Sequence, residues 1–416
     1  MKQDTLSIHG GFAGDSISGA TAVPICQTVS YAYKTAQELA DVFHGKAPGY
    51  IYTRIANPTT TALEARLNLL EDGIGCIATS SGMAAIASVV MNLTRAGDEI
   101  IAATGIFGGT VSLFENTLGR FGVKTNFVDA ANTNQFAKAI NDTTKLIFIE
   151  TIGNPRMDVP DIPEIAEIAH KANVPLVVDN TVTTPFIIRP VDFGADIVVH
   201  STSKFINGHG TAIGGAIIDT GNYNWRKGAF DDIRDLSERV GQLAFLANLR
   251  NLIYRDLGGC PAPMNSFLML QGLETLPVRI VKHDENAKQL AQFLQTHPKV
   301  SWVNYPGLTD SRFSERVTKL FAGCGGGLLT FGLGDKQRAF NFIDSLKLAK
   351  NLANLGDAKT LVVHPASTIF HEFSITEQNK MGVTEDMVRV SVGIEDFEDI
   401  KADFQQAIER AFKETK

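Results

Sequence analysis

Cysteine is scarce in this sequence, with four residues in 416, at Cys26, Cys76, Cys260 and Cys324. Cysteines this sparse and far apart provide neither a disulfide framework nor the ligand spacing of a zinc site. No apolar run reaches the roughly 18 residues that a membrane-spanning helix needs. The N-terminal MKQDTLSIHGG lacks the basic and apolar regions of a signal peptide. We therefore expect a cytoplasmic protein that binds no metal and no membrane.

Basic residues are outnumbered, because 38 lysines and arginines stand against 45 aspartates and glutamates, giving a net charge of −7. Without a basic excess the chain has no electrostatic attraction for a phosphate backbone, so we expect no nucleic-acid partner. A hydrophobic content of 44% excludes a disordered chain or a collagen-like fibre. A chain of this length favours two or three domains.

The chain divides into three parts by its pattern. Residues 1–59 show no helical or strand periodicity and contain scattered glycines and prolines. This pattern predicts an extended arm that contacts a neighbouring subunit. In residues 60–262 short apolar runs alternate with helical segments such as 110–121 and 162–172, the pattern of a mostly parallel sheet covered on both faces. Its expected strands are 74–78, 99–103, 124–128, 146–150, 175–179 and 197–200.

Residues 263–416 predict a smaller α+β domain. A long helix is expected over 265–295, with a kink at Pro277, and is followed by strands mixed with helices. The expected strands are 301–304, 327–332, 360–363 and 388–392, before a terminal helix. The predicted fold class is therefore α/β, with a large doubly wound sheet domain and a small C-terminal domain.

Polar side chains stand where several predicted strands end. Asp179 closes the run PLVVD, Lys204 follows the run DIVVH in the segment STSK, and Asn154 follows KLIFIE. Upstream, Ser80-Ser81-Gly82-Met83 opens a helix whose free N–H groups and hydroxyls suit an anion. Ligands of such sheets bind beyond the carboxyl ends of the strands, so these residues form a candidate site.

This set matches the needs of pyridoxal phosphate: a lysine for a Schiff base, a carboxylate beside the pyridine nitrogen and a phosphate cup. Lys204 and Asp179 would be the first two, and Ser201 and Ser203 lie beside the lysine. Each residue alone has a simpler explanation, since strand-end aspartates are often turn residues and lysines are usually solvated. Their joint occurrence in this order favours the cofactor.

Other classes fit less well. Ser201-Thr202-Ser203-Lys204 satisfies the S-x-x-K pattern of penicillin-recognising hydrolases, but no S-D-N or K-T-G follows. A nicotinamide dehydrogenase would need G-x-G-x-x-G after the first strand, which is absent. His200 and His209 flank the lysine without a carboxylate cluster, so core or loop roles are favoured over metal binding. A non-catalytic protein of the same fold stays open.

The whole pattern, above all HSTSKFINGHG around Lys204, resembles the Cys/Met-metabolism family of pyridoxal-phosphate enzymes, from Tyr52 to the segment of Arg389. That group contains cystathionine γ-synthase, cystathionine lyases, methionine γ-lyase and the sulfhydrylases that act on O-acetylhomoserine. The resemblance implies the type I aminotransferase-like fold. It also implies a homotetramer built from dimers that share active sites.

The resemblance also implies roles for individual residues. Lys204 would bind the cofactor and shuttle protons, Asp179 would pair with the pyridine nitrogen, and Arg389 would hold the substrate carboxylate. Tyr52, also expected to be catalytic, and Arg54 would reach the phosphate of a neighbouring subunit, where a guanidinium fork suits two phosphate oxygens. The remaining expected cofactor contacts are Ser81, Gly82, Met83, Phe107, Asn154, Thr181, Ser201 and Ser203, and Asn354 is expected to contact substrate.

Three features favour the sulfhydrylases within the group. Phe107 stands where many members have a tyrosine, so a ring can stack there but no hydroxyl assists the leaving group. Acetate needs less such help than a thiolate. The loop around Asn354 and the segment 219–232 with Trp225 also resemble sulfhydrylases, although segment 219–232 alone is equally well explained as a solvated loop.

The implied reaction is γ-replacement on O-acetyl-L-homoserine with sulfide, or a thiol such as methanethiol, giving homocysteine or methionine and acetate. Cystathionine γ-synthase and methionine or cystathionine γ-lyase activities stay open as alternatives. The resemblance leaves the acyl group and the thiol donor undetermined.

Overall fold

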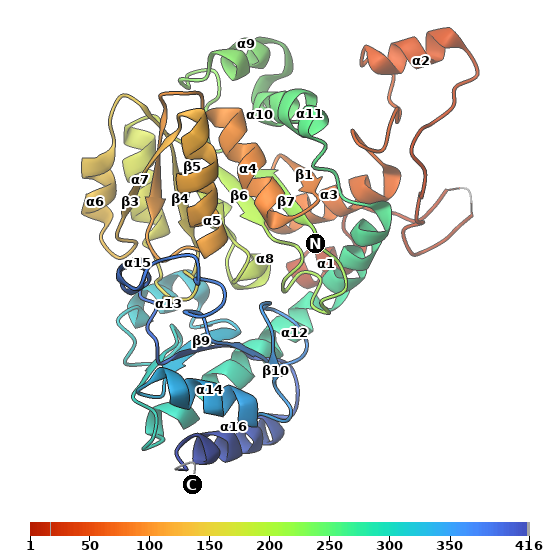
Figure 1. The fold of residues 1–416 in the computed structure, drawn as a ribbon. Helices are drawn as coiled ribbons and strands as arrows, with labels where there is room; N and C mark the ends of the chain where they lie inside the picture. Colours follow the sequence, from red (N-terminus) through yellow and green to blue (C-terminus); the bar gives the residue numbers. More distant parts are fainter. Residues whose placement is uncertain (17, 414–416) are drawn as a thin grey trace.

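Two β-sheets organise the computed structural model, which describes residues 1–16 and 18–413 (Figure 1). Residue 17 of the predicted arm and residues 414–416 of the predicted C-terminal domain lie outside the described part. The larger sheet has the strand order β1-β7-β6-β5-β4-β2-β3. Its strands are β1 (Gly75–Thr79), β2 (Glu99–Ala103), β3 (Lys124–Val128), β4 (Thr144–Glu150), β5 (Leu176–Asp179), β6 (Ile197–His200) and β7 (Gly215–Asp219).

The expected doubly wound, mostly parallel sheet is confirmed, with one correction. Strand β7 was not predicted, and it pairs antiparallel with both β1 and β6. The run GGAIID that forms it is short and follows a glycine-rich segment, so no helical period separates it from β6. The central strands are buried along nearly their whole length, which explains their continuous apolar sequence.

Helices cover this sheet through apolar faces. Contacts join α4 to β6 and β7, α7 to β5, α6 to β3, and α3 to β1. The helices before the second sheet are α1 (Gln3–His9), α2 (Ala36–Phe43), α3 (Pro58–Glu71), α4 (Gly82–Leu93), α5 (Gly108–Ser112), α6 (Thr133–Ala139), α7 (Ile162–Lys171), α8 (Thr184–Ile187), α9 (Asp231–Val240), α10 (Ala244–Leu249) and α11 (Arg255–Leu257).

The helix expected over 110–121 is not uniform. Regular α-helix covers only α5, and a π-turn (Leu113–Thr117) and a 3₁₀ turn (Leu118–Phe121) follow it. A second π-turn (Arg250–Tyr254) joins α10 to α11, and 3₁₀ turns cover Pro190–Phe193 and Gly241–Leu243. The apolar spacing predicts a helical path but does not distinguish these hydrogen-bond patterns.

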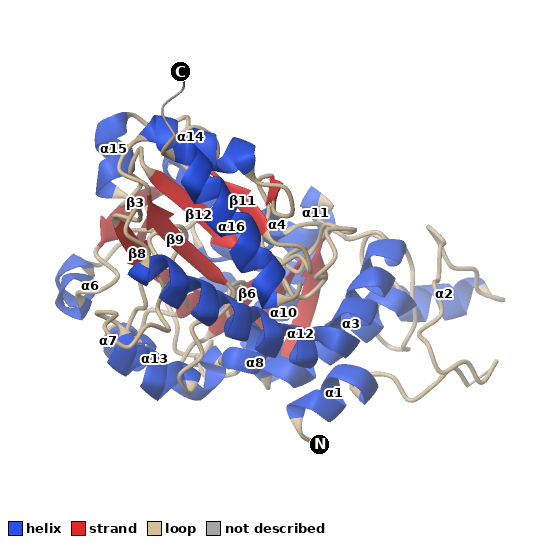
Figure 2. Cartoon of the chain, turned by 90° about the horizontal axis from the view of Figure 1, so that it is seen from below, coloured by secondary structure: helices blue, strands red, loops and turns tan. Residues whose placement is uncertain are grey.

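The second sheet has the order β10-β11-β12-β9-β8 and its own apolar core. The strands are β8 (Trp302–Asn304), β9 (Leu328–Gly332), β10 (Lys350–Asn351), β11 (Leu361–Val363) and β12 (Met387–Ser391). The helices are α12 (Pro263–Thr296), α13 (Ser314–Phe321), α14 (Lys336–Ser345), α15 (Ile375–Lys380) and α16 (Phe397–Ala411). Figure 2 shows α16 and α14 against this sheet. The division at residues 59/60 and 262/263 stays a prediction.

The predicted arm is only partly extended. Helix α1 packs on α3 and α12, whereas α2 projects away from the body in both views (Figures 1 and 2). Side chains along this projecting segment remain exposed, including Val29 and Phe43. No described helix has the length and apolar character needed to cross a membrane.

The core of the second sheet predicts a clear stability effect. Phe331 is fully buried on β9 and packs edge-to-face on Phe342. We expect Phe331→Ala to lower the free energy of unfolding by about 3–5 kcal/mol, because it removes a large apolar side chain and leaves a cavity. Urea unfolding of the wild type and of the variant measures this change in the free energy of unfolding. Phe121→Ala, at a ring 66% exposed, is the matched control and should change stability little. Equal effects of the two variants would contradict the packing described.

Candidate active site

A cavity of about 810 Å³ lies beyond the carboxyl ends of β4, β5 and β6 and is closed by residues of the second sheet's half of the chain. Every predicted site residue lines it except Tyr52 and Arg54. The lining predicted residues are Ser81, Gly82, Met83, Phe107, Asn154, Asp179, Thr181, Ser201, Ser203, Lys204, Asn354 and Arg389. The tertiary structure thus brings together segments more than 300 residues apart in the sequence.

Lys204 follows β6 and reaches across the cavity. Its Nζ donates a hydrogen bond to Asn354 Oδ1 at 2.8 Å, so a residue of the second half of the chain holds the amine. Burial, together with the nearby positive charge of Arg389, lowers the pKa of Lys204 to about 8. Because the uncharged amine is the nucleophile, this environment prepares Lys204 to attack an aldehyde carbon near neutral pH.

Asp179 ends β5 on the cavity wall. Its Oδ1 accepts a hydrogen bond from the Thr181 N–H at 2.9 Å. Burial raises the pKa of Asp179, whereas hydrogen bonds from Thr181 and the charge of His200 lower it. A partly buried carboxylate of this kind, held by an N–H donor, is suited to a cationic partner such as a protonated ring nitrogen.

An anion cradle is built where α4 begins. The Ser81 hydroxyl accepts a hydrogen bond from the Ala84 N–H at 3.1 Å. The first N–H groups of a helix, here those of Gly82 and Met83, have no intrahelical acceptor and favour an anion. A Cβ on Gly82 would lie 2.6 Å from Ser201 Cβ, so only glycine allows the helix start to approach the Ser201 loop this closely.

Two predicted cradle hydroxyls already have partners. Ser203 Oγ donates to the Gly214 carbonyl at 3.2 Å and accepts from the Gly214 N–H at 3.0 Å. Thr181 Oγ1 accepts from the Ser201 N–H at 2.7 Å. The hydroxyl of Ser201 faces the same cavity. Through Gly214, Ser203 links the lysine loop to the residue that directly precedes β7, the strand that sequence analysis missed.

Arg389 is a buried cation, 3% exposed, on β12. Its guanidinium donates to Asn154 Oδ1 at 3.2 Å and to the Asn354 carbonyl at 3.0 Å. Its Nε is buried without a hydrogen-bond partner among the described residues. Burial lowers the pKa of Arg389 to about 10. A buried guanidinium with an unused N–H is suited to a carboxylate ligand.

These donors fit pyridoxal phosphate. An anion cradle at a helix start, a carboxylate for a ring nitrogen and an amine with a lowered pKa lie around one cavity of suitable size. The unpartnered Arg389 Nε adds a position for the carboxylate of an amino-acid substrate. The chemistry of the donor set, rather than any single residue, carries this fit.

Tyr52 and Arg54 do not join this group within the chain. Tyr52 is 40% exposed, and Arg54 stacks over its ring with 5.5 Å between the guanidinium carbon and the ring centroid. Arg54 also donates to the Arg255 carbonyl. Both residues stand near the base of the projecting arm, so their expected contact with a neighbouring subunit stays a prediction.

Sequence reasoning missed one charged cavity residue, Glu150, at the end of β4. The signal was present, because Glu150 closes a buried strand just as Asp179 does.

Trp225 of the segment 219–232 is buried and stacks on Phe245 at 4.8 Å between ring centroids, so a purely solvated loop is excluded there.

The two histidines that flank Lys204 in the sequence, His200 and His209, each interact with a protein group. His200 is buried, and its Nε2 lies 2.5 Å from Glu71 Oε1. His209 Nδ1 lies 2.7 Å from the Asn207 carbonyl. No group of three potential metal ligands occurs among residues 1–16 and 18–413.

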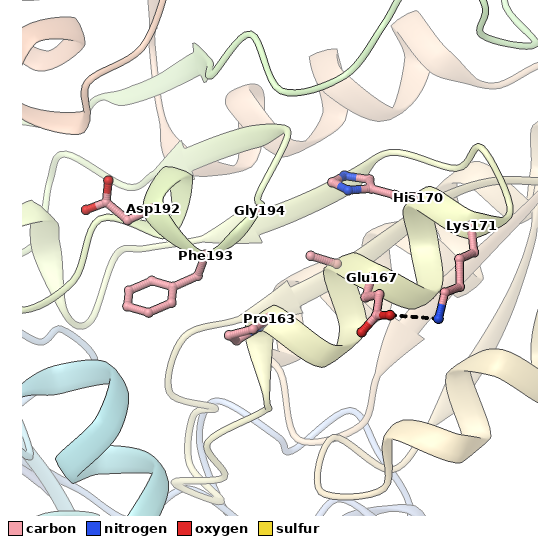
Figure 3. Close-up of a pocket in the computed structure, with 8 residues that line it drawn as sticks. Pro163, Glu167, His170, Lys171, Asp192, Phe193 and Gly194 are labelled. Carbon is pink, nitrogen blue, oxygen red and sulfur yellow. Dashed lines mark ion pairs between the residues drawn. The ribbon is translucent and has the colours of Figure 1, made fainter.

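A second, more open cavity of about 600 Å³ lies at α7 and the turn before β6 (Figure 3). Its lining includes Glu167 and Lys171, which form an ion pair at 2.7 Å, and Phe193. Both charges of the pair are exposed, and none of the predicted site residues lines this cavity. This second cavity therefore lacks the combination of a lysine, a carboxylate and an anion cradle that surrounds the first cavity.

Comparisons with known proteins identify the family of this chain. The family model described as "Cys/Met metabolism PLP-dependent enzyme" matches residues 4–409. The chain is 44% identical to a homocysteine synthase of Schizosaccharomyces pombe, over 98% of each chain. It is 42% identical to an O-acetyl-L-homoserine sulfhydrylase of Leptospira meyeri, over 98% of this chain and 97% of the relative.

A solved structure from Campylobacter jejuni, described as an O-acetylhomoserine (thiol)-lyase, superposes with a TM-score of 0.92 and 36% identity. The alignment covers 98% of this chain and 100% of that one. In that structure a lysine carries a pyridoxyl 5′-monophosphate group.

The lowered pKa of Lys204 predicts the pH dependence of cofactor attachment. Yellow absorbance on adding pyridoxal phosphate to the cofactor-free protein should appear at a rate that rises through about pH 8, because the neutral amine fraction grows above that pKa. Arg389→Gln should move the midpoint upward, since it removes a positive charge. A reference reaction of pyridoxal phosphate with free lysine corrects for the titration of pyridoxal phosphate itself. A midpoint near the ordinary value of 10.5 would contradict the burial described.

Proposed function

This chain belongs to the Cys/Met-metabolism family of pyridoxal-phosphate-dependent enzymes, and we propose that it catalyses γ-replacement on O-acetyl-L-homoserine. In the proposed reaction the γ-carbon–oxygen bond of the ester breaks and acetate leaves. Sulfide forms the new carbon–sulfur bond, so homocysteine is the product. With methanethiol in place of sulfide, the product is methionine.

One observation carries the choice within the family. Relatives with 42–44% identity over nearly the whole chain are named O-acetyl-L-homoserine sulfhydrylase and homocysteine synthase. The structure described as an O-acetylhomoserine (thiol)-lyase matches the fold at a TM-score of 0.92. The close match extends through the cavity-forming segments from both halves of the chain.

The cofactor, when bound, supplies an electron sink for negative charge that develops at the substrate α-carbon. The chain's residues do the rest. Arg389 binds the substrate carboxylate through its fork and orients the α-carbon toward Lys204. The freed amine of Lys204 takes the α-proton and returns a proton at the end of the reaction. Asp179 stabilises the protonated ring nitrogen, and the α4 N-terminus with Ser201 holds the phosphate.

Phe107 favours an ester substrate over a thioether. The ring lines the cavity but has no hydroxyl to protonate a leaving group. Acetate is a better leaving group than a thiolate and departs without that help. The alternatives, cystathionine γ-synthase and methionine or cystathionine γ-lyase, use the same cofactor site and differ in the nucleophile or in the leaving group.

A product assay tests the proposed reaction. Purified enzyme with O-acetyl-L-homoserine and sulfide should release homocysteine and acetate in equal amounts. Formation of 2-oxobutanoate instead would indicate a γ-lyase, and cystathionine formed only with cysteine would indicate the synthase. Lys204→Ala should lose at least about 10³-fold in kcat, because one group performs attachment and proton transfer. Lys171→Ala, at an exposed lysine, is the control and should retain activity.

The proposed assembly is a homotetramer of dimers in which Tyr52 and Arg54 of one subunit reach the phosphate site of the other. The projecting α2 segment and its exposed apolar side chains support a subunit contact there. We also propose that the enzyme works in the cytoplasm and that residues 1–59, 60–262 and 263–416 form the arm, the cofactor-binding domain and the C-terminal domain.

Subunit mixing tests the shared site. Arg54→Ala and Lys204→Ala should each be nearly inactive, but unfolding and refolding them together should restore roughly a quarter of wild-type activity. Half of randomly paired dimers are hybrids, and each hybrid has one complete site of two. Analytical ultracentrifugation measures the assembly state of each sample. No recovery in a mixture that forms normal tetramers would show that Arg54 acts within its own subunit, and full activity of Arg54→Ala alone would show that Arg54 does not act at the site.

A further inference from the structure

We propose that Glu150 is a positioning residue of the cofactor site: as an uncharged acid it holds Phe107 in place and leaves Asp179 as the only anion beside the cofactor ring. The proposal rests on binding of pyridoxal phosphate and not on the identity of the substrate. The role of Glu150 can therefore be disproved while the proposed reaction stands. Equally, the proposed reaction can be disproved while the role of Glu150 stands.

Two carboxyl groups occupy adjacent positions on the cavity wall. Glu150 on β4 and Asp179 on β5 are register partners in a parallel pair, and both line the cavity. Neighbouring strands are about 4.8 Å apart, so side chains of partner residues on one face are in each other's reach. Two like charges at this separation in a buried site are unfavourable, so the pair carries one negative charge.

The surrounding groups decide which carboxyl keeps the proton. Asp179 receives the Thr181 N–H, and the charge of His200 on β6 favours its anion. His200 is paired in turn with Glu71 at the end of α3. Glu150 forms no ion pair with any Lys, Arg or His among the described residues. Burial and the charge of Asp179 raise its pKa well above the ordinary range, and the hydrogen bond from the Phe107 N–H, which lowers that pKa, only partly offsets them.

The cations across the cavity do not reverse this assignment. Lys204 is held by Asn354, and Arg389 by Asn154 and the Asn354 carbonyl, so neither forms an ion pair with Glu150. The charge therefore stays on Asp179, where the ring nitrogen needs it. An ionised Glu150 would repel Asp179 and offer a second position for the cation.

Glu150 also fixes the residue expected to stack on the ring. Its Oε1 accepts a hydrogen bond from the Phe107 N–H at 2.8 Å. The Phe107 ring closes over Gly109, where an added Cβ would lie 2.5 Å from the ring. Phe107 is 37% exposed toward the cavity. The strand end that bears Glu150 thus sets where the turn before α5 presents its aromatic ring.

Glutamine is the discriminating substitution, because it is uncharged, has nearly the same shape and keeps an oxygen for the Phe107 N–H. We expect Glu150→Gln to retain the visible circular dichroism of the bound cofactor, and its dissociation constant within about twofold. Glu150→Ala should weaken cofactor binding about tenfold, the effect of one lost buried hydrogen bond, and should reduce the dichroism because Phe107 is released.

Loss of the dichroism or of cofactor affinity in Glu150→Gln would show that the carboxylate itself is required, which overturns the proposal. Wild-type dichroism and affinity in Glu150→Ala would show that Glu150 positions nothing. If the alanine variant fails to fold, the glutamine variant and the following infrared measurement still decide.

Infrared difference spectra of the cofactor-free protein measure the proton directly. Near neutral pH, the difference spectrum of wild type minus Glu150→Gln should show the carbonyl stretch of a protonated carboxyl group. Asp219 is a second buried acid, whose pKa burial raises to about 7. The difference spectrum of wild type minus Asp219→Asn is therefore the matched control, and its carbonyl band should fade as the pH rises through about 7. An ionised carboxylate signal from Glu150 near neutral pH would overturn the proposal.

Discussion

Burial of charge at the carboxyl ends of the central strands is the constraint on which this structure depends. Around one cavity Arg389 is buried and Lys204 and Asp179 are partly buried, and burial is the first cause of the pKa shift of each. Removing ionised groups from water is costly unless each one has a partner. The site supplies hydrogen-bond partners in Thr181, Asn354 and Asn154. A bound cofactor and substrate would provide the remaining partners for these charged groups.

The two halves of the chain are both needed for that arrangement. Asn354 holds the amine of Lys204, and Arg389 on β12 binds Asn154 after β4. The second sheet thus does more than add a separate core, because its side chains set the geometry of groups borne by the first. A change in the packing of the two halves would alter the orientation of the lysine even with every cavity residue present.

The candidate site was largely predictable because its chemistry is carried by short local patterns. Asp179 and Lys204 each follow a buried strand, and parallel strands place their carboxyl ends at one edge of a sheet. Glu150 follows the same rule, but its position at the end of a strand does not by itself distinguish a cavity residue from a turn residue. The antiparallel strand β7 escaped prediction because its pairing with β1 and β6 depends on contacts far apart in sequence, which local periodicity does not contain.

The sequence by itself determined most of the strands and helices, the cofactor class and most of the residues that line the candidate site. Only the tertiary structure decided that Asn354 meets Lys204, that Arg389 is buried with an unused N–H, and that Glu150 lies beside Asp179 while Tyr52 stays outside the cavity of its own chain. The reason is physical: motifs and periodicity reflect covalent neighbours and the burial of one face, whereas the charge state and orientation of a side chain depend on every group that packing brings near it.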